Sequence, residues 1–219
     1  MAIDVATKDC TALSEDEINE MAELAAEGAA PHDADWVTEV SKNWVLVGLA
    51  RDGQRLVGFV MFTLERVGGT PAILVGCLVT RDNSKRGTTM RAIVNEQMRR
   101  AVLAFPDEDV LYGACVGTPG GVEAFALFDD LCPRPDYKPS GEDRAWGQRL
   151  DRRLAPGGDY AKREFKVTGS GTPTGVIDHH ASKDVDPEVA EMFADVDAGN
   201  GDCRIMFAWA MSELLEKQL

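Results

Sequence analysis

Three apolar runs rich in β-branched residues follow one another in the first half of the chain, at residues 44–50, 55–65 and 71–80. The segments between them, RDGQ and VGGTP, contain the glycines and polar residues that favour tight hairpin turns. Short apolar runs bounded by turn signals are typical of buried β-strands. The pattern therefore predicts a three-stranded antiparallel meander.

Helical patterns precede this meander. Ser14 and Glu17 have the spacing of a capping box, and the apolar residues that follow them recur on one face until Gly28. We expect a helix there, a second short helix over residues 32–43, and a short strand over residues 2–6.

After the meander the period of the apolar residues becomes helical. Residues 84–105 carry their apolar side chains on one face, and Pro106 ends the pattern. A buried strand over 109–116 and a long helix over 121–131 are predicted next. The helical crossover places the strand of 109–116 beside the meander.

The C-terminal third has weaker patterns. Alternation of apolar and polar residues over 144–154 favours a strand, with a helix as the alternative. Further along we expect a strand over 159–169, a short acidic helix within 184–202, a buried strand or helix over 203–211, and a helical turn over 212–219.

The charge and cysteine content narrow the classes of function. The net charge of −14 argues against binding to nucleic acids or to anionic membranes, and it favours cationic substrates such as amines; a solvated acidic surface is the alternative. The apolar runs are shorter than the roughly 20 residues of a membrane span, and the first residues do not resemble a secretion signal. Five cysteines without a C-x-x-C pair indicate a reducing, cytoplasmic setting.

A basic segment, RDNSKRGTTMRA at residues 81–92, lies between the third strand of the meander and the following helix. The N-terminus of a helix has unpaired N–H groups and the positive end of a dipole, so it binds anions well. Lys85 and Arg86, with Thr88 and Thr89, are therefore candidate ligands of a phosphate group. The alternative is a solvated basic loop with ordinary helix capping.

Three stretches together resemble the GNAT (GCN5-related N-acetyltransferase) superfamily. AILVGCLVTRDNSKRGTTMRAIVNEQMRRAV is similar to the family segment that runs from a central strand through the pyrophosphate loop into a helix. VLYGACVGTPGGVEAFALFDDLC is similar to the next strand and helix, with Ala124, Leu127 and Phe128 in register, and DGQRLVGFVMF is similar to a family hairpin. The resemblance covers residues 1–154, and it implies an α/β (α+β) fold with a mixed, mostly antiparallel central sheet flanked by helices. Residues 155–219 are then a C-terminal extension that completes the sheet, forms a small lobe or serves as an interface.

This resemblance implies an N-acyltransferase that moves an acyl group from acetyl-CoA or another acyl-CoA to a small-molecule or peptide amine, by direct attack in a ternary complex. The donor's pyrophosphate would lie against the basic loop, and its pantetheine arm against the backbone of the third meander strand. The residues implied in donor binding are Leu78, Val79, Lys85, Arg86, Gly87, Thr88, Thr89 and Met90.

The catalytic acid and base are less marked. Phe128 stands where many family members have a tyrosine acid, so Tyr112 and Tyr137 are candidate substitutes, with core packing as the alternative for Tyr112. Glu65, at the end of the second meander strand, is the candidate base, with a solvated surface glutamate as the alternative. Cys115 lacks a histidine nearby in sequence and is expected in the core.

Two other functions remain open. Thr88 and Met90 stand where the family loop has glycine, and a domain that has lost acyl-CoA chemistry would act as a binding or assembly module, as a homodimer or with other partners. An enzyme using an acyl carrier protein would need a basic docking face, for which Arg149, Arg152 and Arg153 are candidates. A polar loop is the preferred interpretation, over a metal site, of the cluster Asp178, His179, His180, Asp184 and Asp186.

Overall fold

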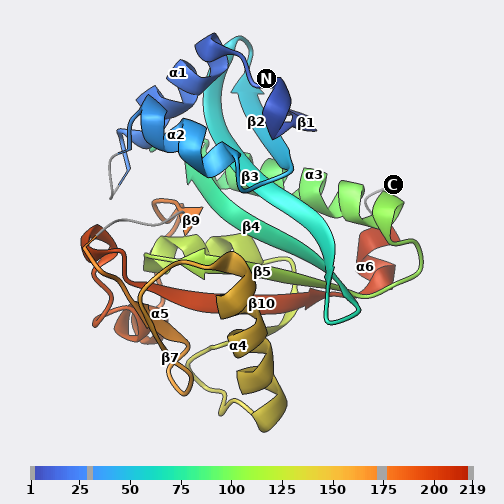
Figure 1. Cartoon of the computed structure of the whole chain (residues 1–219), viewed down its shortest axis with the longest axis vertical. Helices are drawn as coiled ribbons and strands as arrows, with labels where there is room; N and C mark the ends of the chain where they lie inside the picture. The colour runs from blue at the N-terminus through green and yellow to red at the C-terminus, as the bar shows by residue number, and fades with distance from the viewer. Residues whose placement is uncertain (1–2, 29–31, 172–176, 217–219) are drawn as a thin grey trace.

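The computed structural model describes residues 3–28, 32–171 and 177–216. Within them one ten-stranded sheet has the order β1-β2-β3-β4-β9-β5-β10-β8-β7, and β6 pairs with β10 (Figure 1). The strands are β1 (Asp4–Asp9), β2 (Leu46–Asp52), β3 (Arg55–Val67), β4 (Thr70–Thr80), β5 (Val110–Val116), β6 (Asp129–Cys132), β7 (Asp159–Ala161), β8 (Lys166–Thr168), β9 (Ile177–Asp178) and β10 (Cys203–Ala210). The helices are α1 (Glu15–Ala25), α2 (Ala34–Ser41), α3 (Arg86–Ala104), α4 (Gly141–Leu154), α5 (Pro187–Met192) and α6 (Ser212–Glu216), with the 3-10 helices η1 (Cys10–Ala12), η2 (Pro119–Phe125) and η3 (Ala198–Asn200).

The predicted meander is confirmed: β2, β3 and β4 pair in antiparallel order. Glycines at positive φ make both turns, Gly53 at 65° and Gly68 and Gly69 at 61° and 92°. Glycine adopts these values without the steric penalty of a side chain. The capping box of α1 is also confirmed, since Ser14 N–H donates to Glu17 at 2.8 Å and Glu17 N–H donates to the Ser14 hydroxyl.

The strand β5 lies beside the meander after the crossover through α3, as predicted. It pairs in parallel with β4, Ala72–Val75 against Leu111–Ala114. The expected fold class is therefore confirmed: the sheet is mixed and mostly antiparallel, and helices flank it. This parallel pair positions the candidate site described below.

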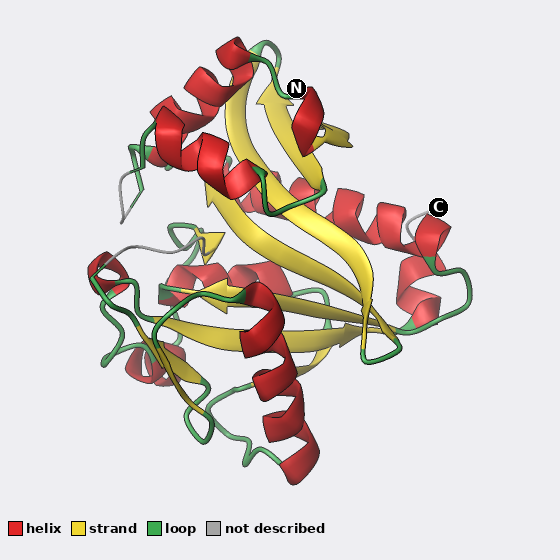
Figure 2. Cartoon of the chain, in the orientation of Figure 1, coloured by secondary structure: helices red, strands yellow, loops and turns green. Residues whose placement is uncertain are grey.

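The helices divide between the two faces of the sheet, with α1, α2 and α4 on one face and α3 on the other (Figure 2). Side chains of β5 alternate accordingly: Tyr112 and Ala114 belong to the core against α3, and Leu111 and Cys115 to the core against α4. This alternation follows from the two-residue period of a strand. Among the described residues, no helix has both the length and the apolar character that crossing a membrane requires.

The long helix predicted over 121–131 is wrong. The chain forms the 3-10 helix η2 and then β6, whose Asp129 and Cys132 pair with Trp209 and Phe207 of β10. The helical spacing of the apolar residues was compatible with either structure. The hydrogen-bonding edge of β10, distant in sequence, decided between them.

The favoured strand over 144–154 is also wrong, because these residues belong to α4. The helix begins at a capping box formed by Ser140 and Asp143. Residues four apart lie on one face in both a strand and a helix, so the spacing of Trp146 and Leu150 fits either element. In the structure both side chains are buried on one face of α4.

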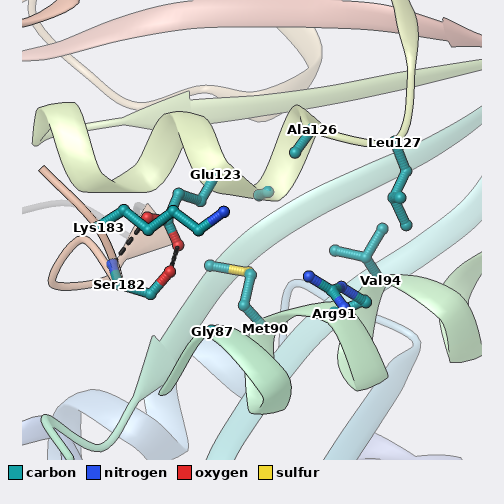
Figure 3. A pocket seen from close by; sticks show the side chains of 10 residues that line it. Gly87, Met90, Arg91, Val94, Glu123, Ala126, Leu127, Ser182 and Lys183 are labelled. Atoms are coloured by element: carbon teal, nitrogen blue, oxygen red, sulfur yellow. Dashed lines mark hydrogen bonds between the residues drawn. The ribbon is translucent and has the colours of Figure 1, made fainter. Parts of the chain in front are cut away.

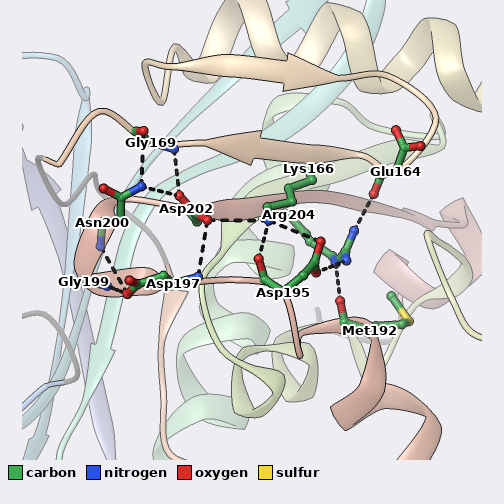
Figure 4. A network of polar contacts seen from close by, with 10 residues as sticks. All are labelled: Glu164, Lys166, Gly169, Met192, Asp195, Asp197, Gly199, Asn200, Asp202 and Arg204. Atoms are coloured by element: carbon green, nitrogen blue, oxygen red, sulfur yellow. Dashed lines mark hydrogen bonds and ion pairs between the residues drawn. The ribbon is translucent and has the colours of Figure 1, made fainter.

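Residues beyond 155 enter the same sheet. The strand β10 pairs along most of its length with β5, and its Cys203 and Arg204 pair with β8. The strands β7 and β8 form a hairpin where a single strand was expected. Figure 4 shows how Arg204 of β10 joins this region: it donates to the carbonyls of Met192 at 2.5 Å and Glu164 at 2.6 Å, and to Asp195 at 2.7 Å. Buried cations need such partners.

Candidate functional site

The strands β4 and β5 separate beyond their paired stretch, and β9 lies between them. Ile177 pairs with Leu78 of β4 and with Val116 of β5, and Asp178 pairs with Val79. Ile177 is completely buried. The separation begins at an irregularity where Met61 faces Cys77 but Phe62 faces Val75, so that Gly76 is the extra residue. We call this place, bounded by Leu78, Val79 and Val116, the fork.

The N-terminus of α3 lies at the same end of the sheet as the fork. β4 ends at Thr80, and only the basic loop separates it from Arg86, the first residue of α3. Asn83 organises this loop: its side chain accepts the N–H of Lys85 at 2.8 Å and its carbonyl accepts the N–H of Arg86 at 3.1 Å. The side chain of Lys85, the N-cap residue of α3, makes no capping hydrogen bond. The fork and a helix N-terminus, two features that suit an amide arm and a phosphate, are thus adjacent.

The basic side chains of the loop are engaged with the protein itself. Lys85 forms an ion pair with Asp52. Arg86 donates to the carbonyls of Asn83 and Ala181, both at 2.9 Å. Thr89 is buried, and its hydroxyl donates to the carbonyl of Lys85 at 3.2 Å. Thr88 is exposed.

A segment from the C-terminal third, residues 177–183, covers both the fork and the start of α3. After β9, His179 is buried, with Nδ1 2.5 Å from the Thr80 hydroxyl and Nε2 3.0 Å from Glu123 Oε2. Ser182 donates its N–H to Glu123 Oε1 and its hydroxyl to Glu123 Oε2, each at 2.7 Å (Figure 3). Glu123, from η2, therefore holds the segment at two points.

Two glycines allow the 177–183 segment to approach so closely. A Cβ atom on Gly87 of α3 would lie 2.6 Å from the Ser182 hydroxyl oxygen, and one on Gly120 of η2 would lie 2.2 Å from the carbonyl oxygen of His179. Both distances are shorter than ordinary contacts. Because glycine has no side chain, these two positions leave room for the 177–183 segment to lie against α3 and η2.

A cavity of about 450 Å³ adjoins these contacts, between α3 and η2 (Figure 3). Its lining is largely apolar, with Glu123 beside Ser182 at one side. Arg91 of α3 and Lys183 of the 177–183 segment also line it, and neither forms a hydrogen bond or ion pair with the described residues. The lining residues are Gly87, Met90, Arg91, Val94, Glu123, Ala124, Ala126, Leu127, Ser182 and Lys183.

Burial and hydrogen bonding shift the two titratable groups beside this cavity. Burial lowers the pKa of His179, and the nearby Glu123 carboxylate offsets this effect only in part. Burial by itself raises the pKa of Glu123, but the hydrogen bonds from His179 and Ser182 outweigh it and leave the pKa below its usual value. A neutral imidazole beside an ionised carboxylate is the arrangement these shifts favour at neutral pH.

Of the predicted donor-binding residues, Leu78 and Val79 border the fork, while Gly87 and Met90 line the cavity. The structure does not bring Glu65 to them. It pairs with Ala72, at the other end of β4 and about 20 Å from Leu78 at the rise of a β-strand. Arg153 holds its carboxylate through two hydrogen bonds, at 2.5 and 2.7 Å.

The two candidate tyrosines lie apart from the cavity lining. Tyr112 is completely buried on the α3 side of the sheet, donates to Gln97 at 3.1 Å and stacks against Phe128; burial raises its pKa far above the usual value. Tyr137 donates to Asp143 at 2.8 Å near the start of α4, and this hydrogen bond raises its pKa. Both roles as acids stay predictions.

Sequence reasoning missed the residues that surround the cavity from outside the loop: Arg91, Glu123, Ser182 and Lys183. Arg91 had a local signal, since it follows Gly87 by four residues and therefore lies on the same face of α3. Glu123, Ser182 and Lys183 had none, because only the tertiary fold brings η2 and the 177–183 segment together. Among residues 3–28, 32–171 and 177–216, no group of three or more His, Cys, Asp or Glu side chains is arranged to hold a metal ion.

No model of a known protein family matches the sequence, and no curated protein matches it. Several solved structures of acyltransferases match this chain at low similarity. An aminoglycoside 6'-acetyltransferase type Ii is 15% identical over 59% of this chain and 86% of its own, with a TM-score of 0.42. An acyl-CoA N-acyltransferase from Pseudomonas aeruginosa is 16% identical over 52% of this chain and 78% of its own, with a TM-score of 0.39.

A ribosomal-protein-alanine N-acetyltransferase from Brucella melitensis biovar Abortus 2308 is 23% identical over 47% of this chain and 73% of its own, with a TM-score of 0.36. One further match, at 13% identity and a TM-score of 0.37, is described as a putative acetyltransferase of the GNAT family from Desulfovibrio desulfuricans. These matched chains are described as acyltransferases or acetyltransferases, and one of them as a member of the GNAT family. Similarities this low leave the activity to be argued from the chain's own residues.

Proposed function

We propose that this protein is an N-acyltransferase that moves an acyl group from an acyl-CoA to an amine. The observation that carries the proposal is the fork between β4 and β5, which lies next to the N-terminus of α3 and to a cavity of about 450 Å³. The strand edges that now pair with Ile177 and Asp178 would offer backbone partners to the amides of pantetheine, and the helix N-terminus would attract the pyrophosphate.

The reaction is a direct displacement. The neutral amine nitrogen attacks the carbonyl carbon of the thioester, the new C–N bond forms, and the C–S bond breaks. The amine loses its proton, and the thiolate of coenzyme A takes up a proton as it leaves. Backbone N–H groups near Leu78 and Val79 would polarise the carbonyl, while binding at the fork holds both reactants in place.

The charges around the cavity support an anionic donor. Arg91 and Lys183 line it and have no anionic partner within the described part of the chain, although the chain as a whole has a net charge of −14. Met90 and Val94 provide an apolar floor beside these cations. An elongated molecule with an apolar or amide-containing arm and a phosphate end matches this lining, and the acidic remainder of the surface favours a cationic amine as acceptor.

Calorimetric titration with acetyl-CoA and with longer acyl-CoA molecules tests the proposal. We expect binding that weakens about tenfold in Arg91→Ala and further in Lys85→Ala/Arg86→Ala, because each phosphate contact is charge-assisted. Arg163→Ala is the matched control, since Arg163 is an exposed arginine in the β7–β8 turn. Absence of binding at millimolar donor, including in the variants described in the next section, would overturn the proposal. Binding unchanged in both loop and cavity variants would overturn only this placement of the phosphates.

The filled fork supports a second candidate function, that of a binding or assembly module. Residues Ile177 and Asp178 already fill the fork by pairing with β4 and β5. A domain in which this filling is permanent would have lost acyl-CoA chemistry and would act as a binding or assembly module. The experiments of the next section separate this alternative from the enzyme.

A further inference from the structure

The structure places the chain's own backbone where the proposed donor would bind. We infer that residues 177–183 are a built-in occupant of the donor site, and that acyl-CoA and this segment exclude one another. The inference rests on the proposed function and adds a means of regulation to it: the enzyme is closed in this structure and opens when the segment leaves.

The overlap at the fork concerns the backbone groups of the strands. Leu78 and Val79 of β4 pair with Ile177 and Asp178, and Val116 of β5 pairs with Ile177 from the other side. A pantetheine arm has two amides and would need the same strand edges. Since the Ile177 side chain is completely buried there, no space remains for a second extended chain.

The overlap continues at the N-terminus of α3. The segment runs from the fork to Ser182. The Cβ of Ser182 lies only 2.7 Å from the position that a Cβ atom on Gly87 would take. The Ala181 carbonyl accepts a hydrogen bond from Arg86 at 2.9 Å, the kind of contact that a phosphate oxygen would make. One segment therefore covers both halves of the proposed donor site, in the order in which pantetheine and pyrophosphate follow each other in coenzyme A.

Apart from the core residue Ile177, the segment is held largely by polar contacts, to Thr80, Arg86 and Glu123, which makes its release feasible. Beyond the buried Ile177 and His179, residues 180, 182 and 183 are exposed. Glu123 receives three of the hydrogen bonds, from the His179 ring and from the N–H and hydroxyl of Ser182. Segments with little buried apolar area open locally far more easily than the core of a domain.

The consequence for binding is quantitative. When only a fraction of the molecules is open, the apparent dissociation constant of the donor is the intrinsic constant divided by that fraction. A closed state favoured by about 2 kcal/mol leaves roughly 3% of the molecules open. Variants that favour the open state should then bind acyl-CoA about 10- to 30-fold more tightly than the unchanged protein.

Two variants open the segment by different routes. Gly120→Ala places a Cβ atom 2.2 Å from the carbonyl oxygen of His179 and so expels the segment by steric conflict. Glu123→Ala removes the acceptor of three hydrogen bonds. The matched controls are Gly141→Ala, where a Cβ meets no atom within 4 Å, and Glu142→Ala, an exposed carboxylate at the start of α4.

An engineered disulfide should hold the 177–183 segment against α3 until it is reduced. In Gly87→Cys/Ser182→Cys the two Cβ atoms start 2.7 Å apart, so a local shift of about 1 Å reaches disulfide geometry. The five native cysteines are buried and free, which leaves the two new thiols as the reactive pair. The oxidised form should bind donor more weakly than the reduced form of the same protein. Because both forms carry the same two substitutions, this comparison separates closure of the segment from any effect of a side chain at position 87.

Calorimetry with acetyl-CoA, together with amide hydrogen exchange at Ser182, reads out these variants. Tighter binding and faster exchange in both opening variants, with binding weakened on oxidation of the cysteine pair, would support the inference. Equal donor affinity in the unchanged protein, the opening variants and the oxidised pair would overturn it and leave the proposed acyltransferase standing. Faster exchange without donor binding in any form would overturn both, in favour of the binding module. Unchanged exchange in both opening variants would show that the segment is not held as inferred.

Discussion

The imidazole of His179 joins two elements that are far apart in sequence: its Nε2 lies 3.0 Å from Glu123 Oε2 in η2, and its Nδ1 lies 2.5 Å from the hydroxyl of Thr80 in β4. His179 is 1% exposed. Its pKa is lowered by burial, despite the adjacent carboxylate. The nearby Arg86 of α3 and His180 also lower the pKa of His179.

This relationship predicts that acid loosens the 177–183 segment. The folded pKa of His179 lies below its ordinary value of 6.5, so the unfolded or released form takes up a proton first as the pH falls. The stability it contributes is present above that value and is lost as the pH falls through the lowered pKa. Glu123, whose pKa is also lowered, adds a loss of the same sign below its ordinary value of 4.5.

Amide exchange at Ser182, corrected for intrinsic rates, should therefore become faster as the pH is lowered from about 7 to about 5. His179→Gln should remove most of the pH dependence of exchange at Ser182. His32 and His180 are unchanged in this variant, so the loss is assigned to His179. A Ser182 amide that is equally protected at both pH values in the unchanged protein would contradict the prediction.

Loss of Arg204 should destabilise the fold strongly. Arg204→Met leaves the carbonyls of Glu164 and Met192 without this donor. It also removes one of the two cations that pair with Asp195, the other being Lys166. Unpaired groups in a nearly buried site cost about 2 to 4 kcal/mol of unfolding free energy. Chemical denaturation followed by circular dichroism measures this loss. Arg163→Ala, at an exposed position, should change the same quantity by less than about 0.5 kcal/mol.

Gly76 and Trp44 should be energetically coupled. A Cβ on Gly76 would lie 1.9 Å from Trp44 Cε2, because the indole covers the irregular point of β4. Gly76→Ala should destabilise the protein by about 1 to 3 kcal/mol through overpacking. In the Trp44→Ala background the same substitution should have a much smaller effect, so a double-mutant cycle by thermal unfolding would give a coupling energy above about 0.5 kcal/mol. Additive effects would contradict the proposed contact.

The cysteines should be slow to react in the native protein. All five are buried and free. Burial raises the pKa of Cys10 to about 11 and that of Cys77 to about 12, so little reactive thiolate forms near neutral pH. Titration with an aromatic disulfide reagent should show no rapid phase in buffer and five reactive thiols in denaturant. A rapid native phase would show that one of them is accessible.

The elements that could be predicted from the sequence are those whose stabilising contacts are local. The hairpin glycines, the capping box of Ser14 and Glu17, and the helical stripe of α3 involve residues only a few positions apart, so their patterns were readable directly. The order of these elements also placed β5 beside β4 and the basic loop at the start of α3, which located the candidate site. The assignment of Leu78, Val79, Gly87 and Met90 to donor binding came from the resemblance to the GNAT superfamily and stays a prediction.

The pairing of backbone groups with segments distant in sequence could be seen only in the tertiary structure. β6 replaces part of a predicted helix because β10 offers it a pairing edge, and the sequence contains no sign of that edge. The 177–183 segment reaches the fork for the same reason: β4 and β5 separate beyond Val75 and Ala114, and Ile177 and Asp178 supply the missing strand. Buried N–H and C=O groups must be paired, and the partner they take is set by proximity in space, which a single sequence does not reveal.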